Sequence, residues 1–416
     1  MWCRASGVRA VNLVPALSGC RTLHVAAGLS AQAQRPQKMP EPVEIPGLEP
    51  ITYWDRMHYV PGLADPKCPP WDRGWEDPWH RRGPKYEEMP LYKEKPCFTF
   101  HQRTKMLEGV KQALWLTKSK LIEGLPKQIL RIAADSANYI EDQDERVKAA
   151  ISHARFWSTT EIRPKRNRFC PVLLQNLLHL CRILQPRFPA LGNRTLAENY
   201  RVTAMWERES DLFRISGLNG ILLSSKQPLP TGAGKEEILS TESYVLPTFY
   251  PISPNIDLQQ TNIYEIHNDT GFRDGYPFPH AHTLYFTECS AHTARFKPEP
   301  LRAKMIMFTF ANAFARAKLL YGEEPKVLDN PITVQCIATN GRMFQFLVLQ
   351  LNTTDLQSSN DGVKNLIWLD QDQLLYDYAK CLPVIRKKMI QVPAGLSGYC
   401  PETFSKFLAM YLHGAV

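Results

Sequence analysis

The clearest pattern of apolar and polar positions lies near the end of the chain. Residues 331–354 read PITVQCIATNGRMFQFLVLQLNTT, two apolar stretches separated by Asn340-Gly341. This dipeptide tolerates the positive φ angles of a type I′ turn, so the pattern predicts a β-hairpin. The apolar-rich stretch 299–322 ends at Gly322 and predicts a helix. The same reading predicts a strand at 365–370 and helices at 370–380 and 401–413.

This order of elements predicts an α/β (α+β) fold, a mixed sheet covered by at least the 299–322 helix. We assign residues 299–416 to this helix-hairpin-strand-helix region. The preceding region, 191–298, is rich in strands and loops, and we expect it to join 299–416 in one compact domain. Its predicted strands lie at 201–206, 212–216 and 221–224.

Helical periodicity dominates residues 101–190. Apolar positions recur at near-helical spacing over 106–122. Acidic residues near the start of 141–155 suit the positive end of a second helix. A third helix is predicted over 171–185, because Pro171 suits the first helical position. We expect these residues to form a small helical region.

The segment before it, residues 39–100, combines proline with aromatic side chains. Residues 40–100 hold twelve of the 33 prolines and four of the nine tryptophans. Proline disfavours a continuous helix, whereas segments that are merely disordered are poor in aromatic residues. We therefore predict an extended arm whose rings dock in separate pockets, either on the protein's own domain or on a partner.

The N-terminal residues 1–38 have the composition of a mitochondrial transit peptide, with five basic residues and no acidic one. Removing them would take five of the 50 basic and none of the 41 acidic residues, lowering the formal net charge from +9 to +4. A protein whose binding depends mainly on contacts to nucleic-acid phosphates carries a larger excess of basic over acidic residues. The charge is therefore compatible with some nucleic-acid contact, but not over most of the surface.

Signatures of phosphate binding and metal binding are weak. TGAGKEE at 231–237 contains a Gly-Lys pair, but Leu229 and Glu236 replace the first glycine and the Ser or Thr of a phosphate-binding loop. We predict a surface loop that leads into a short helix. Zinc-type ligands occur at His280, His282, Cys289 and His292, but a partly exposed strand is the better interpretation of their spacing.

Acidic residues offer no clear catalytic pair. The acidic cluster within 141–145 is explained by the start of a helix, and Asp370 and Asp372 by the start of the predicted 370–380 helix. A nuclease-like fold would place a carboxylate and a lysine on the second hairpin strand, where this chain has Gln350 and Asn352. An RNA-processing enzyme, or an inactive relative of one, therefore stays the alternative interpretation.

Long collinear stretches resemble the mitochondrial large-subunit ribosomal protein thirty-seven family. The matching stretches span about 44 to 415 and include EIPGLEPITYW (44–54), PPWDRGWEDP (69–78), LEGVKQALWLTKSKLIEGLP (107–126), ISHARFW (151–157), TFYPISPNIDL (248–258), NDTGF (268–272), LRAKMIMF (301–308), FLVLQLNTTDL (346–356), GVKNLIWLD (362–370) and ETFSKFLAMYLHGA (402–415).

The resemblance implies a non-catalytic structural component of the large subunit of the mitochondrial ribosome, which supports particle assembly and translation. It implies no catalytic residue, metal or cofactor. The implied partners are other mitochondrial ribosomal proteins, large-subunit rRNA and a related sister family, historically small-subunit protein S-thirty or programmed cell death protein nine. Together with the aromatic arm, it makes the following residues candidate contacts to protein and rRNA: Trp71, Arg73, Trp75, Trp79, Arg81, Arg82 and Lys85.

Overall fold

The computed structural model describes residues 94–156, 164–218, 220–249, 251–287, 298–358, 360–386 and 389–416. The chain divides into two units, residues 1–83 and 84–416, and every described residue belongs to the second. The predicted transit peptide and most of the predicted arm lie outside the described residues.

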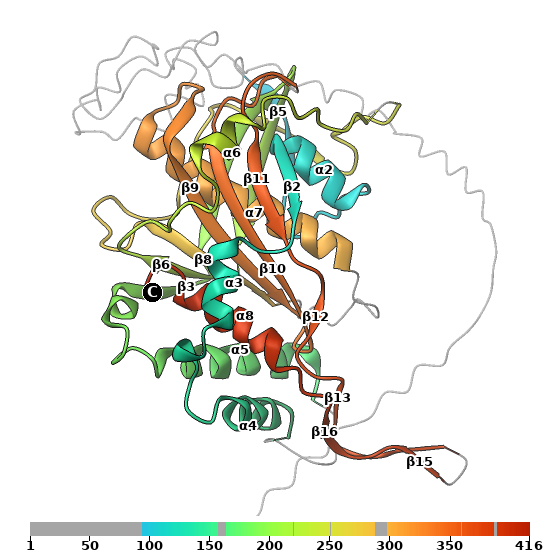
Figure 1. Cartoon of the computed structure of the whole chain (residues 1–416). Coiled ribbons are helices and arrows are strands. Elements are labelled where there is room, and N and C mark those ends of the chain that lie inside the picture. The colour runs from blue at the N-terminus through green and yellow to red at the C-terminus, as the bar shows by residue number, and fades with distance from the viewer. Residues whose placement is uncertain are drawn as a thin grey trace, which may run out of the picture. The chain divides into compact units, whose positions relative to one another are not determined.

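A large mixed sheet forms the centre of the described unit (Figure 1). The pairs β2–β11 and β8–β9 are parallel, and the remaining neighbours are antiparallel. In order across the sheet, the strands are β2 (Ser119–Glu123), β11 (Asn365–Leu369), β10 (Met343–Thr353), β9 (Val327–Thr339), β8 (His280–Thr287), β6 (Ile221–Ser225) and β3 (Arg194–Glu198), with β12 (Gln373–Leu374) beside β10.

Both faces of this sheet are buried. On β10, Leu347 and Leu349 belong to one apolar cluster, while Phe346 and Val348 belong to another. Successive side chains of a strand point to opposite faces, so the continuous apolar run FLVL supplies both clusters at once. Two separate layers must therefore cover the sheet.

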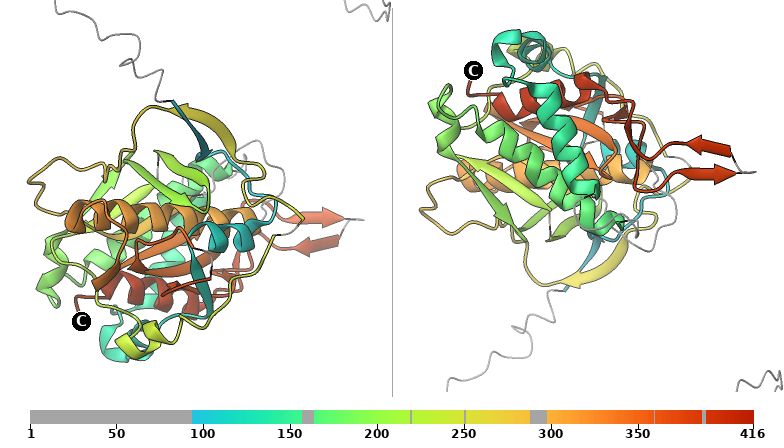
Figure 2. Two further views of the ribbon diagram at one scale, coloured as in Figure 1. Left: turned by 90° about the horizontal axis from the view of Figure 1, so that it is seen from above. Right: turned by 90° about the horizontal axis from the view of Figure 1, so that it is seen from below.

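Helix α7 (Pro298–Tyr321) covers one face, with α2 (Gly109–Leu116) packed beside it. A second sheet lies beyond α7, so that α7 is enclosed between the two sheets (Figure 2). Although α7 is long, none of the described helices is both long and apolar enough to cross a membrane. The strands of the second sheet, in order, are β4 (Arg201–Arg208), β5 (Asp211–Leu218), β1 (Lys95–Phe100) and β7 (Gln259–Ile263).

Helix α8 (Pro401–Leu412) covers the opposite face of the central sheet (Figures 1 and 2). Phe407 of α8 packs edge-on against Phe344 of β10, with ring centroids 6.1 Å apart. The other members of this layer are α3 (Lys127–Ala134), η3 (Ser136–Asn138), α4 (Gln143–Phe156), α5 (Arg166–Arg182) and η4 (Pro189–Asn193).

Two short ribbons and one short helix complete the unit. The ribbon of β14 (Val384–Arg386) and β15 (Met389–Val392) projects from the body (Figure 1). The other ribbon pairs β13 (Tyr378–Lys380) with β16 (Gly395–Ser397), and α6 (Lys235–Leu239) is the short helix.

The α/β (α+β) fold class predicted from the sequence is confirmed, and so are its strongest elements. Helix α7, Pro298–Tyr321, lies where a helix is predicted over 299–322, and Gly322 follows it with φ of 86°. The hairpin of β9 and β10, strand β11 and helix α8 also occur where the sequence predicts them. The short helix after TGAG is α6.

The prediction of one helix over 106–122 is wrong. Helix α2 ends at Leu116, Lys118 has φ of 49°, and Ser119–Glu123 form a strand. The apolar residues of this strand fit a helical spacing locally. Parallel pairing with β11, far later in the chain, decides the conformation.

Two further local predictions are wrong in detail. Helix α5 begins at Arg166, after an extended Lys165, so Pro171 lies inside the helix rather than at its first position. In the hairpin, Gly341 has φ of 85°, but Asn340 is not among the residues with positive φ. The turn is therefore not type I′. Instead, Asn340 Oδ1 accepts hydrogen bonds from the amides of Arg342 and Met343 at 2.9 and 2.8 Å.

The hairpin turn yields a stability prediction. A Cβ on Gly341 would lie 2.4 Å from Cε2 of Phe169, and the residue would also be held at positive φ. We expect Gly341→Ala to lower the free energy of unfolding by about 2–4 kcal/mol, the sum of backbone strain and overpacking. Urea denaturation of the purified chain measures this change.

Gly362→Ala is the matched control, because Gly362 also has positive φ (72°) but nothing lies within 4 Å of its added Cβ. Gly362→Ala should lower the free energy of unfolding only by the strain of holding alanine at positive φ, about 1–2 kcal/mol. Equal losses in the two variants would contradict the assigned role of Phe169.

Candidate interaction surface

The contacts predicted on the N-terminal arm lie outside the described residues. This applies to Trp71, Arg73, Trp75, Trp79, Arg81, Arg82 and Lys85. Their roles stay predictions, and the described unit must be searched on its own for sites that could carry chemistry or binding.

The position of a nuclease's catalytic pair is occupied by two buried amides of β10. Gln350 Oε1 accepts hydrogen bonds from the backbone amides of Gly232 and Ala233 at 2.8 and 2.9 Å. Gln350 also donates to Asn352 Oδ1 at 2.9 Å. Two amides of the TGAGKEE loop, which in a phosphate-binding loop would face phosphate, are thus paired with this side chain.

Hydrogen bonds of a second buried amide side chain, Asn365, connect three segments of the chain. Asn365 Oδ1 accepts from the backbone amide of Asn352 at 2.8 Å, and Asn365 Nδ2 donates to the carbonyl of Thr117 at 3.0 Å. The side chains of Gln350, Asn352 and Asn365 are all buried. Loss of any of these hydrogen bonds would therefore leave a buried polar group with neither a protein partner nor water. These asparagines hold β10, β11 and the α2–β2 connection in register. In the sequence, the only indication of this role is that the two asparagines occur in otherwise apolar strands.

Three buried cations, which the sequence analysis did not identify, anchor the segment after β10. The donors are Lys118 Nζ to Asp355 O (3.1 Å), Arg208 Nη1 to Leu356 O (2.8 Å) and Lys364 Nζ to Gly362 O (2.6 Å). Burial lowers the pKa of all three groups, that of Arg208 to about 10. Arg208 therefore stays protonated at neutral pH and can hold the carbonyl groups of this connection.

His282 of β8 is buried, not partly exposed as the sequence suggests. Its Nδ1 lies 2.7 Å from Thr283 Oγ1 and its Nε2 lies 3.0 Å from the carbonyl oxygen of His413. Arg194 donates to the same carbonyl at 2.8 Å. Burial, followed by the charge of Arg194, lowers the pKa of His282 well below its usual value. This arrangement fixes the C-terminal end of α8 against β3 and β8.

His413 itself belongs to the same buried network. The amide nitrogen of Gln335 on β9 lies within hydrogen-bond distance of His413 Nδ1, and because this nitrogen can only donate, Nδ1 accepts. Burial and the nearby Arg194 lower the pKa of His413 to about 4. A proton on Nδ1 would place two donors against each other.

Of the four zinc-type ligands in the sequence, only two lie within the described residues. Cys289 and His292 lie outside the described residues, while His280 and His282 lie on β8. Within the ranges that the structure describes, no three His, Cys, Asp or Glu side chains gather closely enough to hold a metal ion.

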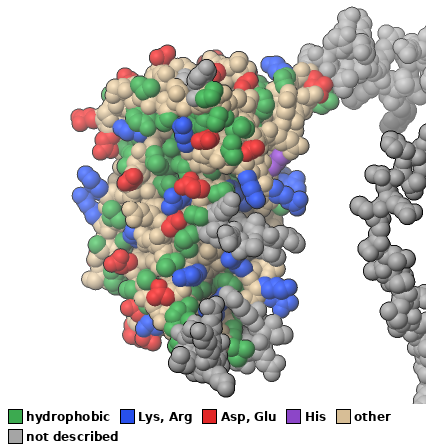
Figure 3. Space-filling model, turned by 90° about the vertical axis from the view of Figure 1, so that its right-hand side faces the viewer, with side chains coloured by type: hydrophobic (Ala, Val, Ile, Leu, Met, Phe, Trp, Pro, Cys, Tyr) green, Lys and Arg blue, Asp and Glu red, His purple; other side chains and the backbone are tan. Residues whose placement is uncertain are grey.

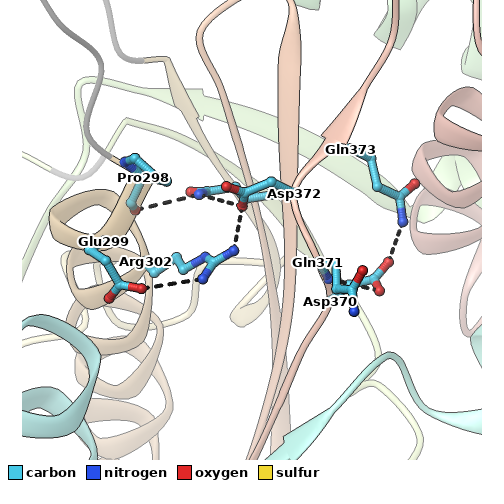
Figure 4. A network of polar contacts seen from close by, with 8 residues as sticks. Pro298, Glu299, Arg302, Asp370, Gln371, Asp372 and Gln373 are labelled. Carbon is cyan, nitrogen blue, oxygen red and sulfur yellow. Dashed lines mark hydrogen bonds and ion pairs between the residues drawn. The ribbon is translucent and has the colours of Figure 1, made fainter.

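Asp370 and Asp372 do not begin a helix, and the predicted 370–380 helix is wrong. Short strands β12 and β13 follow β11 instead. Asp372 accepts from Arg302 of α7 at 2.7 Å and from Gln345 at 2.8 Å, while Asp370 pairs with Lys406 of α8 at 2.6 Å (Figure 4 shows the Asp372 contacts). The two carboxylates connect the end of β11 to the helices on both faces.

The surface offers a groove with an acidic rim, which we call the acidic groove. It has a volume of about 730 Å³ and lies between α3, the start of α4 and the start of α8. Leu130 and Tyr139, 41% and 39% exposed, contribute apolar surface. Its acidic lining residues are Asp142, Asp144, Glu145 and Glu402.

A second hollow, of about 540 Å³, has the opposite charge, and we call it the basic hollow. Arg103, Arg201 and His101 line it, with Thr104, Ser216 and Gln259 among its polar residues. On the face of the molecule shown in Figure 3, acidic and basic side chains are interspersed. The linings of the acidic groove and the basic hollow therefore carry opposite charges.

Comparison with known proteins gives consistent similarities. Residues 288–383 match the family model described as Mitochondrial 28S ribosomal protein S30 (PDCD9). The chain is 58% identical over 370 residues to the large ribosomal subunit protein mL37 of Gallus gallus, covering 89% of this chain and 86% of that protein. It is 55% identical over 388 residues to mL37 of Rattus norvegicus and 54% identical to mL37 of Bos taurus, covering in each case 93% of this chain and 92% of the relative.

The buried histidines predict a pH dependence of stability. An unfolded His binds a proton near pH 6.5, whereas His413 in the folded protein binds one only near pH 4. The unfolded state therefore binds more protons between these values, and stability falls as the pH drops from 7 toward 4. For His413, the loss between pH 7 and pH 5 should be about 2 kcal/mol.

His413→Asn tests this, because its Oδ1 can replace Nδ1 as an acceptor for Gln335 but does not titrate. Urea midpoints at pH 7 and pH 5 should differ less in this variant than in the parent. His267→Gln, at an exposed histidine, is the control and should behave as the parent. An unchanged pH dependence in His413→Asn would refute the assignment.

Proposed function

This chain belongs to the family of large ribosomal subunit protein mL37, and we propose that it is a structural component of the mitochondrial large ribosomal subunit. The observation that carries this proposal is 54–58% identity to mL37 proteins over 89–93% of the chain. Because 93% of the chain matches the mammalian relatives, the matched span includes most of the residues before Glu94. The matched span therefore includes much of residues 39–100, which we propose to form the N-terminal arm.

The protein acts by binding, without catalysing a reaction. Three places where the sequence could have supplied chemistry are engaged in structural contacts: Gln350 and Asn352 bind backbone groups and each other, and His282 supports the C-terminal end of α8. An RNA-processing enzyme of nuclease-like fold is the weaker alternative, because no observation on the described residues favours it.

The partners are other proteins of the mitochondrial ribosome and its large-subunit rRNA. The family model of ribosomal protein S30 (PDCD9) matches residues 288–383, which include α7, β9, β10 and β11. This similarity over the centre of the fold supports our proposal that a related protein of the S30 family is a neighbour in the particle. The arm residues Trp71, Trp75 and Trp79 would dock on protein, and Arg73, Arg81, Arg82 and Lys85 would contact rRNA phosphates.

Sucrose-gradient sedimentation of the tagged full chain from mitochondria tests the function. The chain should sediment with the large ribosomal subunit, and it should remain there at salt concentrations that remove loosely held matrix proteins. Recovery of the chain in free fractions, with metal-dependent RNA cleavage by the purified protein, would support the enzyme alternative instead.

The arm yields a separate prediction. Trp71→Ala, Trp75→Ala and Trp79→Ala together should reduce incorporation into the large subunit several-fold, because each ring is expected to fill a pocket on a neighbouring protein. Quantitative western blotting of gradient fractions measures this.

Normal incorporation of the tryptophan variant, with a lower melting temperature of the isolated chain, would show that the arm packs on its own domain.

A further inference from the structure

We propose that the basic hollow binds the sugar-phosphate backbone of the large-subunit rRNA. This inference rests on the proposed ribosomal function, and it places a contact on residues that the sequence did not identify. The residues that carry it are Arg103 and Arg201, supported by His101, Thr104 and Ser216.

The hollow forms where all four strands of the second sheet meet at one end. Strands β1 and β5 are parallel, so their carboxyl ends, at Phe100 and Leu218, lie together. Strands β4 and β7 run antiparallel to these neighbours and begin at the same end, with Arg201 and Gln259. Residues from four distant parts of the chain are thereby placed around one cavity.

The arginine side chains of the basic hollow are available to bind a ligand. Arg103 and Arg201 are both exposed, and neither side chain makes an ion pair or hydrogen bond with the residues that the structure describes. Among the residues that the structure describes, no Asp or Glu lines the hollow. An arginine without a carboxylate partner keeps its five N–H donors available for phosphate oxygens.

The loop that carries Arg103 is held in place by the body of the protein. The backbone amide of His101 donates to Thr104 Oγ1 at 2.9 Å, and the amide of Thr104 donates back to the carbonyl of His101 at 3.0 Å. The His101 ring, through Nδ1, donates to the carbonyl of Ser216 at 3.2 Å. This fixed loop reduces the entropy lost when Arg103 binds a ligand.

An RNA backbone fits this hollow better than a small phosphorylated molecule or a protein segment. A site for a small molecule buries most of its ligand, whereas both arginines here are exposed and the hollow is lined largely by polar residues. A polymer gains affinity from several such open contacts in series. Hydroxyl and amide groups of Thr104, Ser216 and Gln259 can add hydrogen bonds to phosphate and ribose oxygens.

The acidic groove provides the contrast. Its four carboxylates would repel phosphate, so rRNA is expected to approach the body at the basic hollow and not there. Because the formal net charge is only +9 for the whole chain, binding depends on such local concentration of charge.

The test compares two double variants of the full chain with equal loss of charge. Arg103→Gln with Arg201→Gln removes the proposed contacts. Lys127→Gln with Arg131→Gln, at exposed positions of α3 beside the acidic groove, is the matched control. Binding to an in vitro transcript of mitochondrial large-subunit rRNA is titrated over a series of KCl concentrations.

The association constant for the transcript, K, falls as salt rises, so log K against log salt has a negative slope. Loss of two phosphate contacts should lower the magnitude of this slope by about 1.4 to 1.8, and the control should keep the parent's slope. An unchanged slope in the Arg103/Arg201 variant, or an equal reduction in both variants, would overturn the proposal. The proposal would also be overturned if the Arg103/Arg201 variant bound the transcript normally but lost binding to a ribosomal protein.

Ultraviolet crosslinking of intact large subunits adds a test that needs no substitution. RNA adducts are expected on peptides containing residues 101–104 or Arg201, and not on peptides containing Lys127 and Arg131. If the parent chain sediments with the large subunit but these adducts and the slope change are both missing, this inference fails while the proposed function stands. If the parent chain does not sediment there, the proposed function fails.

Discussion

Strand β10 has no face toward solvent, and the rest of the described unit follows from this constraint. Apolar side chains leave it in both directions, into a layer of α7 and the second sheet on one side and of α5 and α8 on the other. Burying such side chains stabilises the fold by about 1.5–3 kcal/mol each, so neither covering layer is dispensable. The two parallel pairs of the sheet bring in strands from distant parts of the chain to complete it.

Many polar groups inside these layers are tolerated because they have specific partners. Gln350, Asn352 and Asn365 bind one another and nearby backbone groups, and Lys118, Arg208 and Lys364 bind carbonyl groups of the connection after β10. Such networks set register, since shifting a strand by one residue would leave several donors and acceptors unpaired. The residue types resemble those of active sites, but their bonds serve the fold.

Function is therefore to be sought on the surface, as expected of a ribosomal component. The acidic groove and the basic hollow are built from different layers, and their charges would select different neighbours. A body with locally charged cavities, together with the predicted aromatic arm, suits a protein that joins other macromolecules.

The sequence by itself determined the elements whose signals are local: α7 with its final Gly322, the β9–β10 hairpin, α8, and the family resemblance carried by long collinear stretches. Helical periodicity and turn residues act within a few positions, so no distant partner is needed to recognise them. Only the tertiary structure decided that Ser119–Glu123 form a strand, that Asp370 and Asp372 bind Lys406 and Arg302, and that His282 is buried. The same holds for the basic hollow, because a strand's partner and a cavity's lining come from residues far apart in the chain, whose pairing no local pattern encodes.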